Sequence, residues 1–127
     1  MSELNYSVTI REVSKELSAK ERVAIKDTGD CIKLGVQAET ESIVIHPDFW
    51  ATLDVHNDGA KDDKDYTQYV IVDKDGTKYC TGSTSFYDAF MNIVSEMAGS
   101  DEEYGIKVYS LPSKNRAGKT FVTCSIC

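Results

Sequence analysis

Apolar and polar residues alternate through most of this chain, which is the pattern of a strand that buries one face. In "YGIKVYSL", for example, Ile106 and Val108 alternate with Lys107 and Tyr109. Segments of this kind predict strands at residues 5–14, 20–27, 31–37, 42–56 with an interruption at Pro47, 66–73, 77–82, 104–111 and 119–126. The run "DKDG" predicts a turn between two of them. The chain is therefore expected to be mainly β.

One segment has helical periodicity instead. After "GSTS", Ser83 or Ser85 can cap a helix that runs to about Ala98 and ends at Gly99. Its apolar residues share one face and predict a stripe that packs into the core: Phe86, Phe90, Ile93, Val94 and Met97. Tyr87 lies off this stripe, so we expect it to be exposed or at an interface.

The order of strands and helix suggests a fold class. Three strands, one helix and two further strands are the connectivity of an OB-fold, a Greek-key barrel whose helix lies between its third and fourth strands. Residues 66–126 fit this order, whereas the N-terminal third holds more strand candidates than a five-stranded barrel needs. We therefore expect an OB-fold-like barrel with extra N-terminal strand material, as a single domain over residues 1–127.

The segment "SKNRAGKT" is one glycine short of a phosphate-binding P-loop, because Ser113 stands where the first glycine belongs. A P-loop needs a helix after it, so that the helix N-terminus faces the phosphates. Here "KTFVTCSIC" follows, which alternates like a strand. We therefore interpret the segment as a loop that joins two strands of a hairpin.

Charge is unevenly distributed along the chain. The net charge is −7, which would disfavour nucleic acid as a partner, because a polyanion is bound mainly through Lys and Arg. Seven aspartates, however, lie between Asp54 and Asp75, and no acidic residue occurs from Tyr104 to Cys127. The cations of this last stretch are Lys107, Lys114, Arg116 and Lys119. A basic surface can therefore exist on an acidic protein.

The last two strands would present that surface. If Ile106, Val108, Val122, Cys124 and Ile126 point inward, the residues that alternate with them emerge on the opposite face: Lys107, Tyr109, Lys119 and Phe121. Cations that bind phosphates and aromatic rings that stack on bases are what single-stranded nucleic acid requires. Lys114 and Arg116 of the connecting loop would add phosphate contacts. The alternative is a solvated face without a ligand.

Three other aromatic residues are candidates for base stacking. Tyr69 and Tyr79 lie in predicted strands whose buried face the pattern leaves open, and core packing or a tyrosine pair would explain them equally. Trp50 follows "HPDF", where it could stack on a base, close the end of a barrel or contact another subunit.

Other kinds of chemistry have weaker support. "DVHNDGAKDDKD" resembles a calcium loop, but His56 occupies a ligand position and the flanks look extended. Cys124 and Cys127 point to opposite faces of a strand, so we expect no zinc site and place Cys80 and Cys124 in the core. His46 and His56 have no recognised nucleophile context. We expect no catalysis, no metal or other cofactor and no membrane span, and a cytoplasmic location.

Three stretches carry a resemblance to a known family: "VTIREVSKELSAKERVAIKD", "YVIVDKDGTKYCTGSTSFYDAFMNIV" and "IKVYSLPSKNRAGKTFVTCSI". Together they resemble the small OB-type single-stranded-DNA-binding proteins of bacteriophages, including those of protein-primed phages. The resemblance implies sequence-independent binding of single-stranded DNA in replication or recombination, with self-association or other replication proteins as further partners. The acidic stretch motivates a different hypothesis, a small phage protein that inhibits a host protein by presenting carboxylates in place of DNA phosphates, as a DNA mimic or anti-CRISPR protein.

Overall fold

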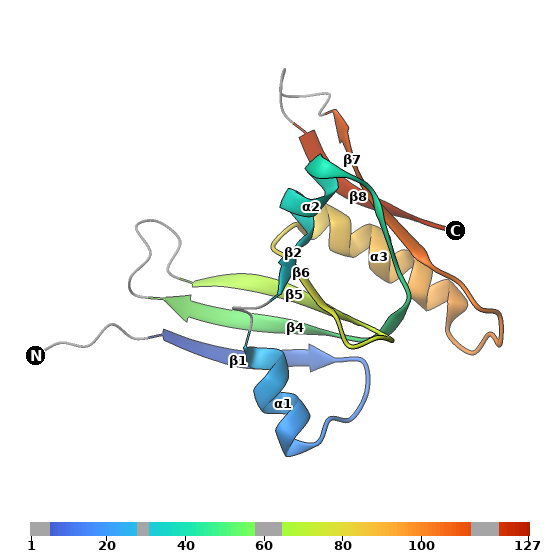
Figure 1. Ribbon diagram of the computed structural model, residues 1–127. Helices are drawn as coiled ribbons and strands as arrows, with labels where there is room; N and C mark the ends of the chain where they lie inside the picture. Colours follow the sequence, from blue (N-terminus) through green and yellow to red (C-terminus); the bar gives the residue numbers. More distant parts are fainter. Residues whose placement is uncertain (1–5, 28–30, 58–64, 113–119) are drawn as a thin grey trace, which may run out of the picture.

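The computed structural model describes residues 6–27, 31–57, 65–112 and 120–127 (Figure 1). The protein is mainly β, as the alternating pattern predicts. The elements in chain order are β1 (Tyr6–Val13), α1 (Ala19–Lys26), β2 (Ile32–Lys33), α2 (Leu34–Thr40), β3 (Ile43–Ile45), β4 (Pro47–Asn57), β5 (Asp65–Asp73), β6 (Lys78–Thr81), α3 (Thr84–Met97), β7 (Ile106–Pro112) and β8 (Thr120–Ile126).

The strands form two sheets. The larger sheet has the order β1-β4-β5-β6-β2, and the smaller one has the order β3-β7-β8. The predicted strand over residues 42–56 is divided between them, because β3 pairs with β7 whereas β4 pairs with β5. His46 forms the corner: its backbone N–H donates to Asp73 Oδ2 at 3.0 Å, and its carbonyl accepts from the N–H of Lys74 at 2.9 Å. Pro47 lacks an N–H group, so the ladder is interrupted here.

No closed barrel forms among the described strands. An OB-type closure would need β6 to pair with β8. Instead, the edge of β6 that would pair with β8 is paired in parallel with β2. Ile32 lies opposite Tyr79, and Lys33 lies opposite Cys80. Helix α2 follows β2 directly and packs against β7 and β8. The segment β2–α2 therefore occupies the place where a barrel would close.

Two of the strand predictions are wrong. Of residues 20–27, all but the C-cap Asp27 belong to α1, which begins at a capping box: the Ser18 hydroxyl accepts from the N–H of Glu21, and the Glu21 carboxylate accepts from the N–H of Ser18. Residues 31–37 are split between the two-residue strand β2 and helix α2. Leu34 and Ala38 are both buried, and residues four apart lie on the same face of a helix. The alternation of apolar and polar residues in this segment hid that helical spacing.

The prediction of helix α3 is confirmed. Ser83 is the N-cap, and its hydroxyl accepts from the N–H of Phe86 at 3.2 Å. The helix ends at Met97, two residues before Gly99, whose φ of 81° suits glycine. Phe86, Phe90 and Val94 of the predicted stripe are buried, whereas the other two members, Ile93 and Met97, are partly buried.

Apolar side chains pack against both faces of the larger sheet. Helix α1 lies on one face (Figure 1), where a core cluster consists of Leu17, Ile25, Phe49, Ala51, Leu53, Val55, Val70, Val72 and Cys80. The other face packs on α3 and the smaller sheet, with a second cluster that contains Ile71, Phe86, Phe90, Ile106 and Val108. Consecutive residues of β5 therefore enter different cores, which explains its unbroken apolar run "YVIV".

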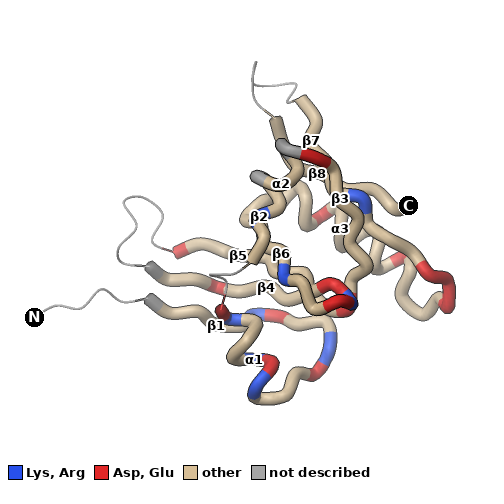
Figure 2. The backbone as a smooth tube through the Cα atoms, viewed as in Figure 1, with Lys and Arg blue, Asp and Glu red and all other residues tan. Residues whose placement is uncertain are grey.

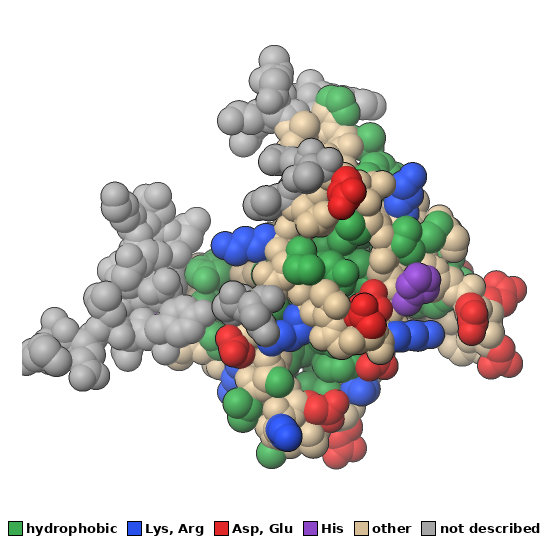
Figure 3. Space-filling view, in the orientation of Figure 1, with side chains coloured by type: hydrophobic (Ala, Val, Ile, Leu, Met, Phe, Trp, Pro, Cys, Tyr) green, Lys and Arg blue, Asp and Glu red, His purple; other side chains and the backbone are tan. Residues whose placement is uncertain are grey.

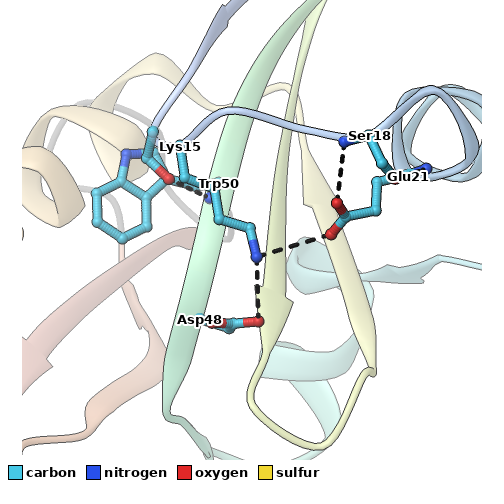
Figure 4. A network of polar contacts seen from close by, with 6 residues as sticks. Lys15, Ser18, Glu21, Asp48 and Trp50 are labelled. Carbon is cyan, nitrogen blue, oxygen red and sulfur yellow. Dashed lines mark hydrogen bonds and ion pairs between the residues drawn. The ribbon is translucent and has the colours of Figure 1, made fainter.

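The corner between β1 and α1 is fixed to β4 by polar contacts (Figure 4). Lys15 Nζ lies 3.7 Å from Glu21 Oε2 and 3.9 Å from Asp48 Oδ2, and 4.4 Å from the centre of the Phe49 ring. The Ser14 hydroxyl accepts from the N–H of Trp50, and the N–H of Ser14 donates to the Trp50 carbonyl. The N-terminal segment thus adds strand β1 and a covering helix to the larger sheet.

Candidate nucleic-acid interface

The outward face of the β7–β8 hairpin brings predicted site residues together. In the register of the two strands Lys107 lies opposite Ser125, Tyr109 opposite Thr123, and Leu111 opposite Phe121, so that all six side chains share one face. On the inward face Ile106, Val108, Val122 and Cys124 are buried as predicted. Ile126 lies on the same inward face, opposite Ile106, but is 50 % exposed because it is the last residue of an edge strand.

The side chains of this face form a mixed apolar and basic surface. The Tyr109 hydroxyl lies 2.6 Å from Ser125 Oγ, which holds the ring along the strand, and Lys107 Nζ lies 6.0 Å from the centre of that ring. Phe121 and Leu111 are each 40 % exposed. We call this surface, with Lys107, Tyr109, Leu111 and Phe121, the β7–β8 face. The Phe121 ring is thus exposed to solvent, whereas Tyr109 is partly buried.

A groove of about 680 Å³ adjoins the β7–β8 face between the two sheets. Residues of β2, β5, β6 and β8 line it, among them Lys33, Tyr66, Gln68, Cys80 and Phe121. Tyr66 is 39 % exposed, so the groove contains two half-exposed aromatic rings. Its described lining residues include Lys33 as a cation and no carboxylate. Phe121 belongs to both the groove and the β7–β8 face and makes them continuous.

Strands β7 and β8 carry no acidic residue. Figure 2 shows no acidic residue along β7 and β8, in keeping with the sequence from Tyr104 onward. Figure 3 shows acidic side chains gathered at the end of the molecule where α3 connects to β7, on the right in this view. Asp101, Glu102 and Glu103 lie in that connection and are exposed. This acidic group thus lies at the end of the hairpin where β7 begins, whereas Leu111 and Phe121 lie toward the other end.

Part of the predicted site lies outside the described residues. Lys114, Arg116 and Lys119 belong to residues 113–119, which join β7 to β8. The described neighbours of this segment are Pro112, at the end of β7, and Thr120, which lines the groove.

Trp50, Tyr69 and Tyr79 lie apart from the β7–β8 face, on the side of the larger sheet that packs on α3. The Trp50 ring meets the Phe90 ring edge to face, with centroids 5.2 Å apart. Figure 4 shows this ring and the Lys15 side chain on opposite sides of β4. Tyr79 packs against the cluster around α3, and burial raises the pKa of its hydroxyl. The three side chains are thus partly buried, and their role in stacking stays a prediction.

Tyr87 completes this aromatic group. Its ring stacks on that of Tyr69, and its hydroxyl accepts a hydrogen bond from the Thr52 hydroxyl at 3.2 Å. Burial raises the pKa of the Tyr87 hydroxyl. Tyr87 lies off the buried stripe of α3, but it is partly buried against the larger sheet, so the expectation that it is exposed or at an interface is wrong.

Sequence reasoning missed Tyr66 and Lys33 as members of the site. Tyr66 has the opposite parity to Tyr69 in β5, so it projects to the other face of the sheet, where the groove lies. Lys33 was expected within a longer strand, whereas it ends β2 and turns into α2 at the rim of the groove. The parity of Tyr66 was readable from the sequence, but which face stays open depends on the covering helix α1.

His56 has a carboxylate partner, and two of the described cysteines are in the core. His56 Nδ1 lies 2.6 Å from Asp65 Oδ1, across the end of the β4–β5 ladder. Cys80 and Cys124 are buried, as predicted. Within the described parts of the chain, no cluster of three or more His, Cys, Asp or Glu residues could hold a metal ion. Most of the calcium-like stretch, residues 58–64, lies outside them.

No protein-family profile, curated protein or solved structure matches this chain. No helix in the described segments has the length and apolar character needed to cross a membrane.

Proposed function

We propose that this protein is a non-catalytic, sequence-independent single-stranded-DNA-binding protein whose interface is the β7–β8 face together with the adjoining groove. The observation that carries the proposal is Phe121, a half-exposed aromatic residue shared by both surfaces, within a stretch that has no acidic residue. A solvated strand pair has no need of an exposed phenyl ring there. Stacking on a base gives that ring a partner.

The chemistry of the surface suits a single strand better than a duplex. Unpaired bases expose their flat faces, and Tyr66, Tyr109 and Phe121 offer rings for them. Lys33 and Lys107 stand near these rings and can contact the phosphates on either side of a stacked base. In a duplex the bases are already stacked on one another, so the aromatic rings would remain unused. Binding of this kind carries little sequence preference, because every base has a π face.

The connectivity supports the same assignment. The bent strand β3–β4, then β5, β6, α3, β7 and β8, follow one another in the order of an OB-fold, and we propose that the protein is an open variant of it. In OB-folds the second and third strands, with the first and last hairpin loops, bind oligonucleotides. The corresponding elements here are β5, β6 and the segments 58–64 and 113–119. Tyr66 and Phe121 each follow one of these segments closely in the chain.

Salt dependence provides the experiment. Fluorescence anisotropy with a labelled oligo(dT) over a salt series should show binding that weakens as salt rises, and a duplex of equal length should bind more weakly. Replacing Lys114, Arg116 and Lys119 by alanine should lower the salt slope by about 2, at roughly 0.7 per phosphate contact on a single strand. The matched control replaces Lys20, Arg22 and Lys26 of α1, which removes the same charge from another surface.

The outcomes separate the two functional hypotheses. Binding that is unaffected by the first triple substitution, or weakened equally by the control, would contradict the proposed interface. An absence of binding even at low salt would refute the DNA-binding function and favour the inhibitor that mimics DNA. Binding that disappears in EDTA would contradict the proposal that no metal takes part.

A further inference from the structure

Two cysteines that are distant in sequence meet at the junction of β2 and β6. Cys31 precedes β2 directly, and Cys80 is the third residue of β6. The parallel register, with Lys33 opposite Cys80, directs both thiols to the same side of the strand pair. Cys80 belongs to the core cluster under α1, Cys31 is a partly buried residue that packs against the same cluster, and a side-chain hydrogen bond links the two thiols.

The two thiols differ in accessibility. Cys80 is 2 % exposed, at the wall of the groove, whereas Cys31 is only partly buried. A bulky reagent can therefore reach the Cys31 sulfur first. Cys80 forms part of the wall of the groove but is almost wholly covered, so a reagent of the size of oxidised glutathione has little access to its sulfur.

The surroundings also activate one of the pair. The hydrogen bond with Cys31 lowers the pKa of Cys80 to about 7, against the effect of burial, and Gln68 and the positive charge of Lys33 act in the same direction. Cys124 provides the contrast, because burial alone raises its pKa to about 11. At neutral pH a part of the protein therefore holds the pair as one thiol and one thiolate. The thiolate is the reactive form of a cysteine.

We propose that Cys31 and Cys80 form a redox-active thiol pair that low-molecular-weight disulfides, such as oxidised glutathione, convert into an intramolecular disulfide. The inference goes beyond DNA binding and does not depend on it. The new bond would tie β2 to β6 at the wall of the groove. Reduced glutathione or another thiol reductant would reverse it.

The reaction balances in two exchange steps. The Cys31 sulfur attacks one sulfur of oxidised glutathione as its proton passes to Cys80, the S–S bond of the reagent breaks, and one glutathione leaves as a thiolate. Cys80 then loses its proton to solvent and attacks the Cys31 sulfur, which displaces the second glutathione. The two protein thiols are oxidised by two electrons, and the reagent is reduced to two molecules of glutathione.

Thiol counting on the folded protein tests the proposal. The Cys127→Ser variant removes the exposed terminal thiol, so three of the four free cysteines remain. Incubation with oxidised glutathione, followed by alkylation in denaturant, should reduce the number of free thiols from three to one. Non-reducing peptide mass spectrometry should then show Cys31 linked to Cys80, with Cys124 alkylated.

Two variants keep the test decisive. In Cys31→Ser, Cys80 should stay unmodified, because the reagent cannot reach it. In Cys80→Ser, glutathione should remain attached to Cys31, because no thiol displaces it. If the latter variant fails to fold, the Cys127→Ser protein alone decides. Glutathione that persists on Cys31 there, a link to Cys124, or three thiols unchanged would each overturn the proposal.

Discussion

Tyr69 of β5 and Tyr87 of α3 stack with ring centroids 3.9 Å apart and planes inclined by 11°. The pair joins the larger sheet to the helix that packs on it. One face of each ring is covered by the other ring, so the contact serves the protein's own packing. This explains why an aromatic residue lies on α3 outside the buried apolar stripe.

Replacing Tyr87 should reveal the value of this contact. We expect Tyr87→Ala to lower the free energy of unfolding by about 2 to 4 kcal/mol, since it removes buried ring surface and an aromatic pair. Tyr87→Phe keeps the ring and loses only the hydrogen bond from Thr52, so about 1 kcal/mol should be lost. Urea unfolding measures both. Equal losses in the two variants would show that the stack contributes nothing.

The aromatic rings of the β7–β8 face should behave in the opposite way. We expect Phe121→Ala and Tyr109→Ala each to weaken binding of oligo(dT) by roughly 1 to 3 kcal/mol through lost base stacking, with little loss of stability. Leu111→Ala is the matched control, since Leu111 lies opposite Phe121 and is equally exposed but cannot stack. Anisotropy titrations at fixed salt provide the measurement. Unchanged affinity in both aromatic variants would move the interface elsewhere.

The sequence predicts an element of this fold well where a periodic pattern of apolar residues coincides with a cap or turn residue nearby in the chain. The N-cap Ser83, the glycine after α3 and the alternation in β7 and β8 each act within a few residues, and those elements are found. The helix α1 was missed although "SAKE" is a capping box, because "ERVAIK" buries only Ile25 and so lacks an apolar stripe. The pairing of β2 with β6 joins segments far apart in the chain, and no local pattern encodes it.

The residues of the site also divide into those that local sequence predicts and those that depend on the packing of distant segments. The shared face of Lys107, Tyr109 and Phe121 is predictable, because side chains alternate between the two faces of a strand. Trp50 and Tyr69 are packed on α3, which depends on the placement of that helix over the sheet. Tyr66 enters the site because residues of β2, β5, β6 and β8 surround a groove between the two sheets. Such relationships arise only when two layers pack.

Gly105, just before β7, should tolerate no side chain. A Cβ atom there would lie 2.8 Å from Val44 Cγ1, 3.1 Å from Cys127 Sγ and 3.3 Å from His46 Nε2. We expect Gly105→Ala to cost about 1 to 3 kcal/mol of stability by overpacking. Gly35→Ala is the control, because a Cβ meets nothing within 4 Å and alanine favours the helix α2. Thermal unfolding in which both variants match the parent would contradict the expectation.

The two buried cysteines should give stability an unusual dependence on pH. The pKa of Cys80 is lowered from 9.0 to about 7 in the folded protein, so between these values the unfolded chain holds more protons and stability rises with pH. The pKa of Cys124 is raised from 9.0 to about 11, so above pH 9 the unfolded chain loses its proton first and stability falls. These two thiols together favour a maximum near pH 9.

Comparison of variants isolates each contribution from the other titrating groups. With a reductant present, urea unfolding at pH 7 and pH 9 should show the parent gaining on the order of 2 kcal/mol relative to Cys80→Ala, because two pKa units separate the folded and unfolded thiols. Between pH 9 and pH 11 the parent should lose stability relative to Cys124→Ala by a similar amount, since only the parent must keep a neutral thiol buried. Parallel curves for the parent and Cys80→Ala would show that the Cys80 thiolate is not stabilised in the folded protein, and the contact with Cys31 would then have no effect on its charge.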